Sequence, residues 1–266
     1  MNSLFVLPLA LVTAGPFAAP SPQGVPVSLR SLIPLPKKPK PKPAEDPVRG
    51  MELAKKAVTG FLSASSVEEM AKFVRNPQRA LPRMMAHYAA PPPQPVTFTF
   101  GTDWKEVDRH GKTFVLSRIT IAFEEVFICA EIPQKGEAMV DWESYTGWCE
   151  MPWAEFVKKG MEKPAEFRVA LIPSDYFNFS YTDKENHVCF RLVDKDNSET
   201  VFAYCAKDSE VHKKIEEALG LQFDGDEPEA REKHITCTLK LSMKAADAVH
   251  RQAVIESFAR EGWVEP

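Results

Sequence analysis

The stretch VDWESYTGWCEMPW, Val140 to Trp153, gathers three of the five tryptophans of the chain with a cysteine and three acidic residues. If it forms a strand, alternate side chains face opposite ways, so Asp141, Glu143 and Tyr145 are expected on one face. A carboxylate in a pocket can act as a general base, and a tyrosine hydroxyl can donate to an oxyanion. The candidates for such chemistry are Asp141 or Glu143 as the base and Tyr145 or Tyr88 as the donor.

The same stretch also suits packing. Large indole rings bury much area where a sheet, a helix and a second domain meet, and Gly147 permits a turn between them. On this interpretation Trp142, Trp148 and Trp153 are structural, and the two carboxylates lie exposed on a solvated strand face, where they contribute little to stability. No feature of the sequence indicates a pocket, so we favour packing over catalysis.

Cys149 is the candidate nucleophile, because it lies just before a helix start expected at Pro152. A thiolate needs a cationic or helix-N-terminal setting, and the nearest histidines along the chain are His110 and His187. The chain has five cysteines, an odd number, and four of them lie in apolar, strand-like text. We therefore interpret the cysteines as small core residues in preference to a disulfide framework.

The sequence predicts no metal and no cofactor. His234 and Cys237 are three residues apart on an expected strand, so they point to opposite faces, and no two histidines have helical ligand spacing. The 12 glycines form no phosphate-binding loop.

Charge argues against nucleic acid as a partner. Residues 21–49 carry six basic and two acidic side chains, a net of +4, and residues 1–20 carry none. With a total of −4, residues 50–266 hold −8, and the part from residue 165 on has 13 basic against 20 acidic residues, a net of −7. Such a surface repels phosphate backbones.

The N-terminus has the pattern of an export signal. Leu4–Val12 is an apolar run with the length of a signal-peptide core, too short to span a bilayer, and small residues follow it. We expect a signal peptide at 1–20, export to the periplasm or the extracellular space, and no stable membrane span. A proline- and lysine-rich linker follows at 21–49, because the prolines of Pro34–Pro47 block both helix and sheet.

The elements that must position the candidate residues come after the linker. Apolar spacing predicts helices at 51–62, 67–74 and 81–88. Alternation then predicts four antiparallel strands at 96–107, 112–123, 125–133 and 137–145, followed by a helix at Trp153–Lys159 that ends at Gly160.

The last hundred residues have a different order. We expect strands at 166–172 (continuing toward Tyr181), 187–194 and 199–206, a helix at 209–219 with Asp208 as its N-cap, and strands at 234–243 and 252–258. This is the order of a five-stranded OB-type barrel. Aromatic residues near its first strand are candidates for stacking against a protein or glycan partner, or for packing the barrel; they are Tyr176, Phe177, Phe179 and Tyr181.

Helices that lead into a four-stranded sheet, with the phrases AVTGFLSASSVEEMAKFVRNP and VDWESYTGW, resemble the nuclear-transport-factor-like, or ketosteroid-isomerase-like, cone fold. A clear strand between the second and third helices is missing. The whole chain resembles a group of uncharacterised bacterial exported proteins in which such a region precedes a small β domain. The resemblance implies an α+β fold: helices packed on a curved antiparallel sheet (50–162), followed by a small OB-like β-barrel domain (163–266).

The function expected from these features is that of a non-catalytic exported binding or assembly module. Its partner is a protein or a small-molecule ligand, and a homodimer is an open alternative. The competing hypothesis is a small-molecule-binding or isomerase-like enzyme that uses the interior of the cone.

Overall fold

The computed structural model describes residues 47–109, 111–220 and 234–265. The expected signal peptide at 1–20 and the expected linker up to residue 46 lie outside these residues. The first helix begins at Pro47, three residues earlier than the linker boundary at residue 49 implies. Within the described ranges, no helix combines the length and the apolar character that crossing a membrane requires.

Three helices open the described chain: α1 (Pro47–Leu62), α2 (Val67–Ala71) and α3 (Pro77–His87). Ser66 caps α2 by accepting a hydrogen bond from the Glu69 backbone N–H at 3.2 Å. The expectation that the third helix begins at Leu81 is wrong. Pro77 is its first residue, a position where proline is favoured because its missing N–H has no helical acceptor anyway.

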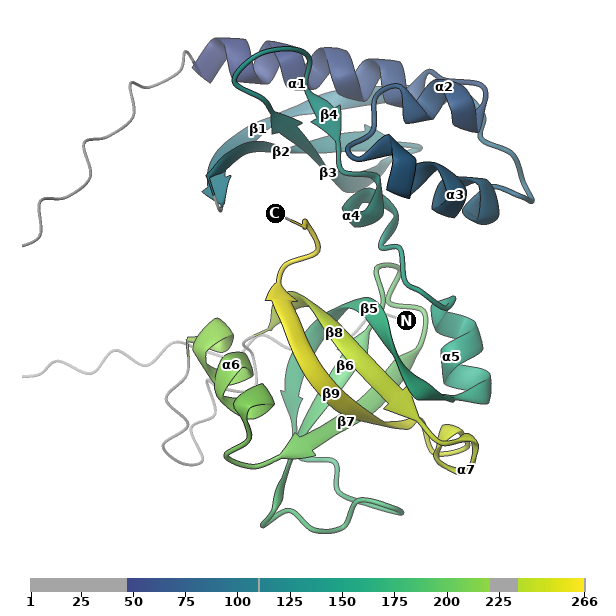
Figure 1. The fold of residues 1–266 in the computed structure, drawn as a ribbon, viewed down its shortest axis with the longest axis vertical. Helices are drawn as coiled ribbons and strands as arrows, with labels where there is room; N and C mark the ends of the chain where they lie inside the picture. The colour runs from purple at the N-terminus through teal and green to yellow at the C-terminus, as the bar shows by residue number, and fades with distance from the viewer. Residues whose placement is uncertain (1–46, 110, 221–233, 266) are drawn as a thin grey trace, which may run out of the picture. The chain divides into compact units, whose positions relative to one another are not determined.

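The helices pack on a four-stranded antiparallel sheet with the order β1-β2-β3-β4. Its strands are β1 (Phe98–Arg109), β2 (Lys112–Ile121), β3 (Glu124–Ile132) and β4 (Met139–Val140). The sheet is curved, and α1 runs across one of its faces (Figure 1). The first three expected strands are thereby confirmed.

The fourth expected strand is wrong beyond Val140. A short helix, α4 (Trp142–Thr146), follows β4 at once, with Asp141 as its N-cap. The Asp141 carboxylate accepts a hydrogen bond from the Ser144 backbone N–H at 2.8 Å, and Gly147 ends the helix at a φ of 64°. An N-cap acid and a left-handed glycine six residues after it are strong local helix signals, and they override the alternation of apolar residues.

After α5 (Trp153–Lys159), which is confirmed, five strands close into a barrel with the order β5-β6-β7-β9-β8. The strands are β5 (Met161–Ser174), β6 (His187–Val193), β7 (Thr200–Ala206), β8 (Ile235–Met243) and β9 (Gln252–Glu261). Helices α6 (Glu210–Leu219) and α7 (Ala245–Ala248) lie between strands. The expected continuation of β5 toward Tyr181 is wrong, and Ser209, in place of Asp208, caps α6.

The described chain has two hydrophobic cores. One lies between α1, α3 and the sheet and includes Phe61, Met84 and Trp142. The other fills the barrel and includes Phe167 together with Trp153 and Phe156 of α5. The cores therefore divide between α4 and α5, earlier in the chain than the boundary expected at 162/163, and α5 packs with the barrel.

Candidate functional site

Glu143 of α4 is the centre of a buried ion-pair cluster. Its Oε2 accepts hydrogen bonds from Arg79 Nη2 at 2.9 Å and from Arg168 Nη2 at 3.0 Å, and its Oε1 pairs with Arg83. The residue is 4% exposed. Arg79 and Arg83 are one turn apart on α3, whereas Arg168 comes from β5, so one carboxylate joins a helix that packs on the sheet to a strand of the barrel.

Asp141 is buried in the same cluster. Arg75, which lies between α2 and α3, forms an ion pair with Asp141 and another with Glu131 of β3. The Arg75 guanidinium also lies 4.9 Å from the ring centroid of Phe114. We name this set the ion-pair cluster: its members are Arg75, Arg79, Arg83, Arg168, Glu131, Asp141 and Glu143.

Arg168 is a charged side chain that is 1% exposed. Its Nη1 donates to the Trp148 carbonyl at 2.7 Å, and the Trp148 ring lies 5.8 Å from its guanidinium and 4.0 Å from that of Arg83. Burial lowers the pKa of Arg168, and the carboxylates of Glu143 and Glu166 oppose that shift. For Arg79, burial also lowers the pKa, but the neighbouring carboxylates outweigh it, so the net shift is upward.

The two candidate tyrosines lie apart from these carboxylates in the core beneath α3 and α4. Tyr88 Oη accepts a hydrogen bond from Trp142 Nε1 at 3.3 Å, and burial raises the pKa of Tyr88. Tyr145 packs edge-on against Phe61 at 5.4 Å, and burial raises its pKa to about 12. Tyr145 contacts Asp141 through its backbone N–H, which donates to the Asp141 carbonyl at 3.1 Å, and among the described residues neither tyrosine hydroxyl has a hydrogen bond to the carboxylate of Asp141 or Glu143.

Cys149 does not lie in the cationic setting that a nucleophile needs. Its Sγ accepts a hydrogen bond from the Arg168 backbone N–H at 3.3 Å, yet burial dominates and raises the pKa of Cys149 to about 11. The sulfur is therefore a thiol near neutral pH. All five cysteines are unpaired, and burial raises the pKa of both Cys129 and Cys205 to about 12.

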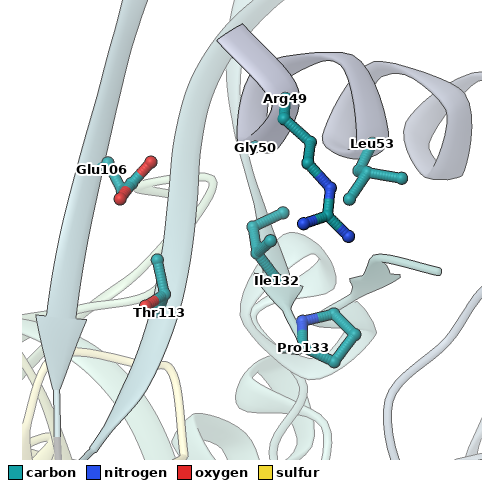
Figure 2. Close-up of a pocket in the computed structure, with 7 residues that line it drawn as sticks. All are labelled: Arg49, Gly50, Leu53, Glu106, Thr113, Ile132 and Pro133. Atoms are coloured by element: carbon teal, nitrogen blue, oxygen red, sulfur yellow. The ribbon is translucent and has the colours of Figure 1, made fainter. Parts of the chain in front are cut away.

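Two hollows are the best defined in the described part of the chain, and each has a volume of about 10 Å³. One lies beneath the first turn of α1, where Arg49 and Leu53 face Ile132 and Pro133 (Figure 2). The other borders the ion-pair cluster and is lined by Arg75, Arg79, Asp141 and Glu143, among others. A volume of this size holds a single water molecule.

A second candidate site lies on the barrel. The loop Asp175–Asn186 between β5 and β6, here called the aromatic loop, packs against β7 and the start of β9. The ring of Tyr176 stacks on Phe202 at 4.1 Å, and that of Tyr181 stacks on Tyr204 at 4.0 Å with the rings nearly parallel. Strand alternation directs Phe202 and Tyr204 outward, because their neighbour Ala203 is in the barrel core.

Buried polar groups fix this loop to the barrel. Gln252 is fully buried, and its Nε2 donates to the Asn178 carbonyl at 2.8 Å and to Tyr204 Oη at 3.0 Å. Tyr204 Oη donates to the Tyr176 carbonyl at 2.7 Å. These buried hydrogen bonds are directional, so they fix the position of the loop on the barrel more specifically than apolar contacts alone would.

At the tip of the aromatic loop, the ring of Phe179 stacks on His250 at 3.7 Å with an interplanar angle of 6°. Phe179 is 50% exposed and has a φ of 52°, an uncommon backbone conformation for an aromatic residue. Beside it, Ser180 Oγ donates to the Asp247 carboxylate at 2.6 Å, and Val249 is 79% exposed. The loop tip and the β8–β9 connection thus meet in a stacked aromatic pair, in which Phe179 is half exposed and polar groups lie alongside.

Comparisons with protein-family models, with curated proteins and with solved structures find no match for this chain. Within the described ranges, no group of three or more histidine, cysteine, aspartate or glutamate side chains has the arrangement of a metal site. The chemistry of the two candidate sites rests on their own geometry.

Sequence reasoning missed the arginines. Arg75, Arg79 and Arg83 recur every four residues, a spacing that places side chains on one helix face and could have indicated a shared acidic partner. Arg168 interrupts the apolar strand EFRVALI, and a charge in such a strand indicates a buried ion pair. His250 has no comparable signal, because its partner Phe179 is 71 residues away in the sequence.

Proposed function

We propose that this chain is a non-catalytic, exported binding module whose ligand contacts the aromatic loop of the barrel. The single observation that carries the proposal is the Phe179–His250 stack, a rigid aromatic pair that is half exposed at the loop tip. Export rests on the apolar run Leu4–Val12 of the sequence.

The topology supports an OB-like barrel. Strand β9 pairs with β7 in parallel and with β8 antiparallel, β5 closes the barrel against β8, and α6 lies between β7 and β8. In OB folds the loop after the first strand and the loop before the last strand flank the ligand. Those two loops correspond to the aromatic loop and the β8–β9 connection, which meet in the Phe179–His250 stack. The curved sheet under α1 likewise supports the cone-type assignment of the first part.

The chemistry of the loop tip favours a neutral glycan. An aromatic ring face packs well against the C–H face of a sugar ring, and the Asp247 carboxylate beside it, which accepts a hydrogen bond from Ser180 Oγ, can accept further hydrogen bonds from sugar hydroxyls. Nucleic acids and other polyanions are disfavoured, because residues 165–266 carry a net charge of −7 (13 basic and 20 acidic residues).

The alternative function, an isomerase-like enzyme, needs a cavity of a few hundred Å³ with an acid inside it. The space between α3, α4 and the sheet instead holds Phe61, Met84 and Trp142, each 1% exposed or less. The two acids that would serve as the base have arginine partners. These observations support binding over catalysis.

The test is a binding screen of the full chain against neutral and anionic oligosaccharides, followed by titration calorimetry with the best ligand. Removing one stacked ring in Phe179→Ala or His250→Ala is expected to weaken binding by at least about fivefold, taking as a guide the about 1–3 kcal/mol that a base stacked on an aromatic side chain contributes.

Phe123→Ala is the matched control. Phe123 is fully exposed at the β2–β3 turn, so its removal deletes an equally accessible ring on another element. It should leave both affinity and melting temperature unchanged. A wild-type chain that binds no glycan at millimolar concentration, or a Phe179→Ala variant that binds as well as Phe123→Ala, would contradict the proposal.

A further inference from the structure

The segment Gly262–Glu265, which follows β9, lies against the ion-pair cluster. The Trp263 carbonyl accepts a hydrogen bond from Arg168 Nε at 3.0 Å, and the Glu265 carbonyl accepts one from Arg75 Nη1 at 2.7 Å. The Glu265 carboxylate forms an ion pair with Arg79. Three arginines of the cluster thus each hold one oxygen of this segment.

The contacts of the segment Gly262–Glu265 are of the kind that hold a bound peptide rather than a strand in a sheet. Only Gly262 continues the ladder, with its N–H donating to the Thr236 carbonyl at 2.7 Å. Beyond it, the segment is held through side chains, and the Trp263 indole Nε1 donates to the Val169 carbonyl at 3.1 Å. Main-chain carbonyls, one anchoring indole and one carboxylate are the groups by which extended acidic peptides are recognised.

Charge complements this occupant. Four guanidinium groups, those of Arg75, Arg79, Arg83 and Arg168, pair with the carboxylates of Glu131, Asp141 and Glu143, and Arg168 also lies 3.5 Å from Glu166. The Glu265 carboxylate adds a further negative charge to this basic surrounding, and Arg79 is its partner. Because Arg75 and Arg168 are almost fully buried, a missing acceptor would leave a guanidinium N–H unpaired away from water.

We propose that Arg75, Arg79 and Arg168 form a binding site for an extended acidic peptide, and that its occupant is the chain's own segment Gly262–Glu265. The bound segment ties the strand that ends the barrel to α3 and to the sheet. This inference is independent of the glycan site on the aromatic loop, which involves none of these residues.

The experiment removes the segment and supplies it again as a separate molecule. A chain that ends at Glu261 is expected to melt at a lower temperature than the full chain. A synthetic peptide with the sequence GWVEP should bind to it with one-to-one stoichiometry in fluorescence anisotropy and should raise its melting temperature again. A GWVQP peptide, which lacks the glutamate side-chain carboxylate, should bind at least tenfold more weakly. Equal melting temperatures with and without the segment, or equal binding of both peptides, would overturn the proposal.

Full-length variants test the same site when the shortened chain does not fold. In Arg79→Gln and in Glu265→Gln, the indole proton of Trp263 should exchange with solvent at least tenfold faster, measured by NMR. Glu261→Gln is the control, because Glu261 makes only a long, half-exposed ion pair with Arg109 at 3.6 Å. If the exchange rate of that indole proton is the same in all three variants, the segment is not held by the arginines.

Discussion

At Glu143, two carboxylate oxygens serve three guanidinium groups. Three arginines thus occupy most of the acceptor sites of this carboxylate, and removing it leaves the buried Arg168 and the partly exposed Arg79 and Arg83 without their shared partner. Breaking a buried ion pair by deleting one partner costs far more than deleting an exposed pair, because the remaining charge keeps its desolvation penalty. At this site, therefore, the acid serves the stability of the fold.

Glu143→Gln is expected to lower the free energy of unfolding by about 3–5 kcal/mol. Chemical denaturation at neutral pH measures it. Glu155→Gln is the control. Glu155 makes an exposed ion pair with Lys159, one turn further along α5, and such pairs contribute about 0.3–0.5 kcal/mol. A Glu143→Gln chain that is more stable than the wild type would instead mark Glu143 as an acid kept for function at the expense of stability.

The sequence identified the acidic and aromatic residues of this site, but it did not predict that the acids are buried. The stretch Val140–Trp153 was expected to serve packing, and Trp142 and Trp153 are indeed buried. The two acids were expected on a solvated face and are instead 4% exposed. Their burial depends on arginines that lie more than 20 residues away in the sequence, and pairing over such distances leaves no local pattern.

At the scale of elements, α4 decides where the acids lie. Its five residues turn the chain from the edge of the sheet toward the barrel, and its C-cap Gly147 has a φ of 64°. A Cβ at that position would lie 2.9 Å from the Cβ of Lys195, in the loop that follows β6. Gly147 is thus required both for its backbone conformation and for a close approach.

Gly147→Ala is expected to destabilise the protein by about 1 kcal/mol for the left-handed backbone, with about 1–3 kcal/mol more for the contact with Lys195. Gly220→Ala separates the two effects. Gly220 ends α6 with a φ of 63°, and a Cβ there would meet nothing within 4 Å. Thermal unfolding of both variants gives the comparison, and equal losses would show that the approach of Lys195 is not tight.

Most elements were predictable, because long periodic segments carry their own signal. The three long strands of the sheet and all five strands of the barrel lie where alternation indicates them, to within a few residues except where β5 begins. Local caps account for the errors. Asp141 and Gly147 converted the end of an expected strand into α4, and Pro77 moved the start of α3 by four residues.

At the scale of the whole molecule, the stretch Val140–Trp153 passes from the core under α1 and α3 to the core of the barrel. The ion-pair cluster connects the two cores at this stretch. Arg168 supplies the contact from the barrel, and Glu143 supplies it from the helical part. A carboxylate with three partners from two elements can hold two cores in a fixed relation without a continuous apolar interface.

Export is the prediction that concerns the chain as a whole. Expression with its own N-terminus in a bacterial host, followed by fractionation and N-terminal sequencing, is expected to yield a chain outside the cytoplasm that lacks about the first 20 residues, as a cleaved signal peptide does. Leu9→Arg interrupts the apolar run and should retain the chain in the cytoplasm. Recovery of the intact wild-type chain from the cytoplasm, starting at Met1, would contradict it.

The parallel pairing of β9 with β7 also sets the order in which the barrel can fold. Strand β9 lies between β7 and β8, so β7 and β8 each lack their second partner until residues 252–261 have been synthesised. The pairing of β7 with β9 joins strands far apart in sequence, and such pairings form slowly. A nascent chain therefore leaves the ribosome with an open barrel and unpaired strand edges, and it needs protection from aggregation during that interval.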